Sequence, residues 1–116
     1  MHELSLCDDL LGQVIELAKL HRAESVISIT VNIGVLSGVE PSLLESAFTI
    51  GRVDTLAGNA RLIVQEVPAR VQCERCGAEA DVSTNQLFCP VCLSHETRLI
   101  SGNELILASV EMDTPA

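Results

Sequence analysis

The sequence predicts an α+β fold, in which two helices pack on a small mixed β-sheet and a cysteine-bearing lobe is inserted before the last strand. Three observations predict it. Apolar residues recur at helical spacing near the chain start, they alternate with period two over residues 26–35, and four of the five cysteines fall within residues 70–100. The expected boundaries are 1–69 plus 101–113 for the main domain and 70–100 for the inserted lobe.

The first element is an amphipathic helix. Ser5-x-x-Asp8 resembles a capping box, so we expect the helix to open near Ser5. Its apolar face follows helical spacing, and it is made of Cys7, Leu10, Leu11, Val14, Leu17 and Ala18. The basic pair His21-Arg22 suits the C-terminus of a helix, where we expect this one to end.

Strands and one further helix complete the main domain. Ile27, Ile29, Val31, Ile33 and Val35 alternate with small or polar residues, which is typical of a half-buried strand. Pro41 suits the first position of a second helix, and Gly58-Asn59 is expected to end it. We expect a second strand over residues 62–67, and a last strand over residues 104–112 that rejoins the first sheet.

Composition limits the possible functions. The chain has 116 residues and a net charge of -9, and aromatic residues make up only 2% of it. Acidic balance repels nucleic acid and anionic membranes, and few aromatic rings are present for bases to stack on. No signal peptide is visible, and no apolar run approaches the roughly 20 residues of a membrane span. We therefore expect a cytoplasmic protein that binds neither nucleic acid nor membrane.

Two C-x-x-C pairs provide the clearest site. Cys73 and Cys76 are followed, after 12 intervening residues, by Cys89 and Cys92. Paired knuckles of this kind form a zinc ribbon, in which four thiolates hold one structural Zn²⁺. Two disulfides would require secretion, and an iron–sulfur cluster usually has different spacing. Because four protein ligands leave no position for water, a zinc hydrolase is disfavoured.

A second candidate site lies at the chain start. The amine of Met1, the imidazole and backbone amide of His2, and the carboxylate of Glu3 could together chelate a metal ion. Nitrogen-rich ligation is preferred by Ni(II) and Cu(II). A histidine at a chain start is more often a plain surface residue, so the residues alone leave both interpretations open.

The remaining cysteine and histidines have simpler interpretations. Cys7 lies on the apolar stripe of the first helix and is expected to be a small buried residue. His95 follows Cys92 by three residues and could replace a thiolate at low pH, although a histidine there is more often an exposed loop residue. His21 is expected to interact with the helix dipole.

Four stretches of the chain form a recognisable set: the start Met1-His2-Glu3-Leu4-Ser5-Leu6-Cys7, the stretch 33–41, the two knuckles and the closing Ser101-Gly102-Asn103-Glu104-Leu105. With them, the whole chain except its last residues resembles the HypA/HybF family of nickel metallochaperones for NiFe-hydrogenase maturation. It implies nickel ligands at His2 and Glu3, with possible help from Met1, and an acidic residue at position 40. Glu40 could equally be a favourable charge at a helix N-terminus. Leu93 departs from the pattern, because a small residue would ease the left-handed turn there.

The resemblance also implies a function. The chain would bind Ni²⁺ transiently, keep Zn²⁺ as a structural ion, and act with a nickel-handling maturation GTPase and the hydrogenase large subunit. It would catalyse no reaction and would be a monomer or weak dimer. The alternative is a zinc-ribbon adaptor for protein interactions that has no nickel role.

Overall fold

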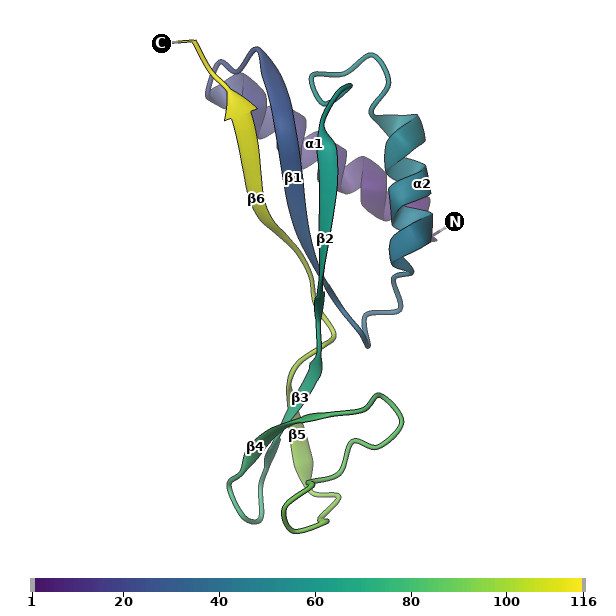
Figure 1. Cartoon of the computed structure of the whole chain (residues 1–116), viewed down its shortest axis with the longest axis vertical. Coiled ribbons are helices and arrows are strands. Elements are labelled where there is room, and N and C mark those ends of the chain that lie inside the picture. The colour runs from purple at the N-terminus through teal and green to yellow at the C-terminus, as the bar shows by residue number, and fades with distance from the viewer. Residues whose placement is uncertain (1, 116) are drawn as a thin grey trace.

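The computed structural model describes residues 2–115, and the side chain of His2 lies outside that description. Two three-stranded sheets follow one another along the 54 Å long axis, and both described helices accompany the first sheet (Figure 1). This arrangement confirms the predicted α+β class. In chain order the elements are α1 (His2–Leu20), β1 (Ser25–Gly34), α2 (Pro41–Gly51), β2 (Arg61–Val67), β3 (Ala69–Cys73), β4 (Glu79–Val82), β5 (Thr97–Ser101) and β6 (Leu105–Asp113).

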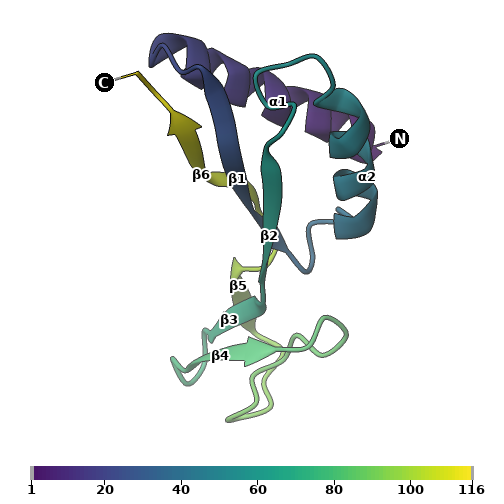
Figure 2. The ribbon, with the colours of Figure 1, turned by 45° about the horizontal axis from the view of Figure 1, so that its top comes forward.

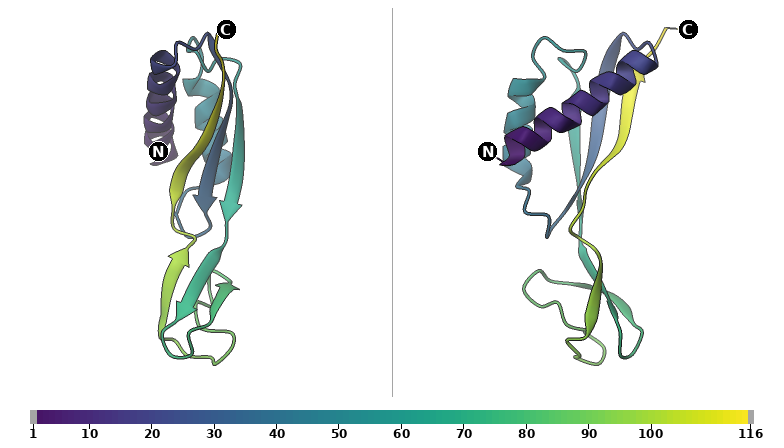
Figure 3. Two further views of the ribbon diagram at one scale, coloured as in Figure 1. Left: turned by 90° about the vertical axis from the view of Figure 1, so that its left-hand side faces the viewer. Right: turned by 180° about the vertical axis from the view of Figure 1, so that it is seen from behind.

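The first sheet is mixed, as predicted. Its order is β2-β1-β6, with β1 parallel to β2 and antiparallel to β6. Both helices pack on one face of it and leave the other face uncovered (Figure 3). The core between helices and sheet is almost wholly aliphatic, since Phe48 is the single aromatic residue of its buried cluster. Residues 104–112 were expected to rejoin this sheet, and β6 does so.

A β-bulge changes which residues of β1 face the core, so the prediction for Ile27 was wrong. The pairing with β6 shifts register between Val26 and Ser28, so Ile27 is the extra residue. Val26 is consequently buried at 2% exposure, whereas Ile27, which was expected to face the core, is 46% exposed. Beyond the bulge, Ile29, Val31 and Ile33 are buried as the alternation predicts.

The first helix begins earlier than predicted and ends where expected. It starts at His2, so Ser5 lies inside the helix and the proposed capping box was wrong. At the other end Arg22 is left-handed with φ 55°, and the Ala23 amide donates to Ala18 O at 2.8 Å. This six-to-one hydrogen bond is typical of a Schellman cap. The cap stops α1 next to His21.

The second helix is shorter than predicted. Pro41 occupies its first turn as expected, but the helix ends at Gly51 and not at Gly58-Asn59. Thr55 donates its backbone amide and its hydroxyl to Arg52 O, and Asp54 is left-handed with φ 61°. These local bonds replace the helical ones, because threonine hydroxyls compete for backbone groups. Residues 52–59 therefore form turns.

The second sheet carries the cysteines. Its order is β4-β3-β5, and both pairings are antiparallel. The two chain segments that link the sheets cross at Gly102, whose φ of 114° favours glycine. A Cβ added to Gly102 would lie 2.7 Å from the Cα of Ala69 in the other linking segment, and a Cβ added to Gly34 would lie 2.2 Å from Gly102 C, so the end of β1 also touches this backbone. That the two sheets fold as separate domains stays a prediction.

Candidate metal centres

The four cysteines of the second sheet converge on one point. Their sulfur atoms all lie within 4.8 Å of one another, and no other group of three or more potential ligands occurs among the side chains described for residues 3–115. Cys73 Sγ lies 3.5 Å from Cys92 Sγ, and Cys76 Sγ lies 3.6 Å from Cys89 Sγ. These distances exceed the ~2.05 Å of a disulfide bond. The sulfurs therefore face one another as four free thiols.

The spacing of the sulfurs fits a tetrahedral metal. A regular tetrahedron with Zn–S bonds of about 2.3 Å places its sulfurs about 3.8 Å apart. The Cys73–Cys92 and Cys76–Cys89 distances are slightly shorter than this value, and no pair exceeds 4.8 Å, so small shifts would close the shell around one ion. The four thiolates can hold a metal ion in a complete shell.

Two matching knuckles position the sulfurs. In the first, the Gly77 amide donates to Cys73 O at 3.0 Å, and in the second, the Leu93 amide donates to Cys89 O at 2.8 Å. Gly77 and Leu93 occupy equivalent places and are both left-handed, with φ of 79° and 64°. The left-handed turn predicted at Leu93 is thus present, formed by a residue whose Cβ makes it unfavourable.

Backbone amides also prepare a thiolate. The N–H of Cys76 and, less strongly, that of Arg75 donate to Cys73 Sγ, at 3.4 and 3.3 Å. These hydrogen bonds lower the pKa of the Cys73 thiol from 9.0 to about 6, although burial opposes them. Because metals bind the thiolate, this bias favours ligation at neutral pH.

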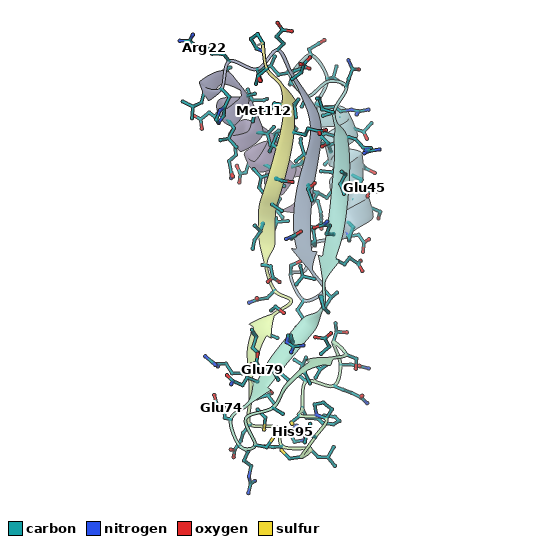
Figure 4. All side chains as sticks on the ribbon, turned by 60° about the vertical axis from the view of Figure 1, so that its left-hand side comes forward. Arg22, Glu45, Glu74, Glu79, His95 and Met112 are labelled. Carbon is teal, nitrogen blue, oxygen red and sulfur yellow. The ribbon has the colours of Figure 1, made fainter. Side chains whose placement is uncertain are left out.

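The other cysteine and the two described histidine side chains are not part of this cluster. Cys7 is 2% exposed, and burial, with the neighbouring charge of Asp8, raises the pKa of its thiol, which agrees with the predicted structural role. His95 is exposed, and its ring lies 5.5 Å from that of Phe88. Figure 4 shows His95 in the part of the molecule formed by the second sheet, where Glu74 and Glu79 also lie. His21 lies just past the end of α1.

The chain start forms a different environment. His2 is the first residue of α1, and Met1 lies outside the described residues. Glu3 is 8% exposed and is the one buried charged or polar side chain in the described part of the chain. Its Oε2 accepts a hydrogen bond from the Glu40 amide at 3.1 Å. Two residues predicted as nickel ligands, 37 positions apart, therefore lie side by side.

Glu40 caps the second helix. It is the N-cap of α2, and its Oε1 accepts from the Ser42 hydroxyl at 3.1 Å and from the Ser42 amide at 3.5 Å. The predicted helix-terminus role is present, and the ligand role stays a prediction. Figure 2 shows the start of α1 beside α2, away from the second sheet that carries the cysteines.

Sequence reasoning missed two features of this site. The hydrogen bond between Glu3 and the Glu40 amide has no signal in the sequence, because it depends on how α1 packs on α2. The hydroxyl of Ser42 was visible in Glu40-Pro41-Ser42, where a polar residue two places beyond an N-cap could have been expected to reach the cap.

Comparison with known proteins decides the family. The family model described as "Hydrogenase/urease nickel incorporation, metallochaperone, hypA" matches residues 1–112. The hydrogenase maturation factor HypA of Nitrosospira multiformis is 44% identical over 98% of this chain and 99% of its own length. The corresponding factor of Aquifex aeolicus is 40% identical over 97% of this chain and 98% of its own.

The chain belongs to the HypA family.

Solved HypA structures share the fold. The solution structure of the Ni metallochaperone HypA from Helicobacter pylori superposes with a TM-score of 0.68 at 27% identity, covering 97% of this chain and 98% of that one. A second HypA solution structure gives a TM-score of 0.73 at 30% identity, covering 97% and 96%. The resemblance noted in the sequence is confirmed. The family is one of nickel metallochaperones with a role in hydrogenase maturation.

Within residues 2–115, neither helix has both the length and the apolar character needed to cross a bilayer.

Proposed function

We propose that the chain binds Ni(II) at its N-terminus and delivers it during maturation of NiFe hydrogenase, while the four cysteines hold a structural Zn²⁺. The observation that carries the nickel assignment is the buried Glu3 carboxylate at the start of α1, which accepts a hydrogen bond from the Glu40 amide. Charged groups are rarely buried unless they are paired or coordinate a metal. A buried carboxylate that directly follows a histidine in the chain is therefore a candidate metal ligand.

The helix start supplies nitrogen donors. The first N–H groups of a helix have no acceptor within the helix, so the His2 amide is available to a metal together with its imidazole and the Met1 amine. The positive end of the helix dipole opposes a bound cation. The carboxylates of Glu3 and Glu40 offset that effect, and either can add an oxygen ligand.

The two centres differ in the way that metal delivery requires. The thiolate shell is complete and is built on hydrogen-bonded knuckles, so its ion stays. The nickel ligands would come from the chain end and from the exposed Glu40, so exchange to another protein needs little rearrangement. Because the mechanism is ligand exchange, the chain acts without catalysing a reaction.

The proposed partners follow from the family role. A nickel-handling maturation GTPase would act in the same step, and the hydrogenase large subunit would receive the metal. The net charge of -9 disfavours nucleic acid and anionic membranes and opposes tight self-association, which supports a monomer or weak dimer. The free thiols suit the reducing cytoplasm.

Metal analysis with matched histidine variants tests the proposal. Wild type, His2→Ala and a form with residues fused ahead of Met1 are loaded with Ni(II) and assayed for both metals. His21→Ala is the control, because it removes an exposed histidine past the far end of α1. We expect one zinc per chain in every form, and one nickel in wild type and the control alone.

Two outcomes would contradict this proposal. Equal nickel binding by all four proteins would refute the N-terminal nickel site. The zinc-ribbon adaptor without a nickel role would then be the favoured function. Nickel found at the thiolates in place of zinc would remove the separation of the two metals.

A further inference from the structure

We propose that Ser42 is a positioning residue for nickel binding, which holds one oxygen of the Glu40 carboxylate so that the other is offered to the metal. The inference rests on the proposed function. It concerns a residue that is not expected to touch the metal and whose hydroxyl acts through the side chain of Glu40.

The contact between the two side chains is the stronger part of the cap. The Ser42 hydroxyl lies 3.1 Å from Glu40 Oε1, whereas the Ser42 amide lies 3.5 Å from the same oxygen. Cap hydrogen bonds to the backbone are normally near 3 Å and are made by shorter side chains such as Ser, Thr or Asp. The Glu40 carboxylate is therefore oriented mainly by a hydroxyl, with weaker help from the helix backbone.

The arrangement leaves half of the carboxylate available. Both hydrogen bonds to the carboxylate go to Oε1, and no hydrogen bond from residues 3–115 reaches Glu40 Oε2. The backbone of Glu40 is fastened separately, since its amide donates to Glu3 Oε2 at 3.1 Å. The main chain and one carboxylate oxygen of Glu40 are thus fixed beside the start of α1. The second oxygen remains available as a ligand for the metal.

The consequence for binding is preorganisation. A free, exposed glutamate samples many rotamers, and a metal that captures it must restrict them. A hydroxyl that already restrains the carboxylate reduces that cost. Residues that hydrogen-bond to metal ligands commonly orient them in this way. Because Ser42 and Glu40 are exposed, the same hydrogen bond adds little to folding. We therefore expect its loss to change nickel affinity more than stability.

Serine variants on one helix provide the test. Ni(II) titrations, read by affinity and by the Ni(II) absorption spectrum, compare wild type with Ser42→Ala, Ser42→Thr and Ser46→Ala. Ser46 lies one turn further along α2, and its hydroxyl donates to Ser42 O at 3.1 Å, so it controls for removal of a serine hydroxyl. We expect Ser42→Ala to weaken binding roughly threefold to tenfold, the range of one hydrogen bond. The threonine variant and the control should match wild type.

A double-mutant cycle shows whether Ser42 acts through Glu40. In a Glu40→Ala background, Ser42→Ala should have no further effect on affinity, because the carboxylate that it orients is gone. Thermal unfolding followed by circular dichroism checks that all variants keep their helices.

The outcomes separate this inference from the proposed function. Unchanged affinity in Ser42→Ala, with weaker binding in Glu40→Ala, would overturn the positioning role and keep Glu40 as a ligand. An equal loss with and without Glu40 would also overturn it. If neither Glu40→Ala nor His2→Ala weakened binding, the N-terminal nickel site itself would fail.

Discussion

The junction between the two sheets allows a stability prediction with an internal control. A Cβ on Gly34 would lie 2.2 Å from both Gly102 C and Gly102 O, and 2.7 Å from the Asn103 amide nitrogen. Carbon atoms in contact prefer about 3.5–4.0 Å, and every obstructing atom is backbone, so no side chain can turn away. Gly34→Ala must therefore push the end of β1 away from residues 102–103, which link β5 to β6.

The expected cost combines two effects. Overpacking in a tight site costs about 1–3 kcal/mol. Separation also weakens the hydrogen bonds from the Gly34 amide to Glu104 O at 2.8 Å and from the Leu36 amide to Gly102 O at 2.6 Å, each about 1 kcal/mol. We expect a loss of about 2–4 kcal/mol in the free energy of unfolding.

The assay is urea unfolding followed by far-ultraviolet circular dichroism, because the chain has neither Trp nor Tyr for fluorescence. The control is Gly12→Ala, an exposed position inside α1 where a Cβ meets nothing within 4 Å. Alanine there should raise stability by about 0.5–1 kcal/mol, because glycine weakens a helix. A Gly34→Ala protein as stable as wild type, or a Gly12→Ala protein that lost as much, would refute the packing argument.

Three further predictions concern the knuckles, the buried thiol and the nickel site. Leu93→Gly should make zinc harder to remove with a chelator, since glycine relieves a left-handed strain of about 1–2 kcal/mol, and Gly77→Ala should make removal easier. Burial raises the pKa of Cys7 above 9.0, so the folded state favours its protonated form. The stability that this contributes is present below pH 9.0 and is lost as the pH rises through the higher folded pKa; Cys7→Ala should unfold without that alkaline loss, and identical pH profiles would contradict this. Nickel affinity should fall as pH drops through the imidazole range near 6.5, because His2 must lose its proton to bind, and titrations showing equal affinity in neutral and mildly acidic buffer would rule this out.

Several features could be predicted because they are written in neighbouring residues. The C-x-x-C pairs place two sulfurs each through a local turn, so four ligands of one metal were evident before any fold was known. The alternation of β1 and the helical spacing of Val14 and Ala18 likewise predicted which face would be buried, and both residues are fully buried. The left-handed turn at Leu93 followed from its place in the knuckle.

Element boundaries depended on bonds that the local pattern does not reveal. The early start of α1, the end of α2 at Gly51 and the bulge at Ile27 were missed. At the end of α2 a specific hydrogen bond, and at the bulge a strand register, outweighed the average preference of the residue types. The bulge, for example, comes from the pairing of β1 with β6, in which Val26 is opposite Met112, 86 positions later in the chain.

The chain by itself determined its chemistry: which donors it carries, that four thiolates would share one ion, and that the start offers nitrogen and oxygen ligands. Only the tertiary structure decided that Glu3, 37 positions before Glu40, is buried against the amide of that residue. The physical reason is range. Turns and periodicities are set by residues a few positions apart, whereas the approach of α1 to α2 results from burying a shared apolar core, and polar groups meet where that packing brings them.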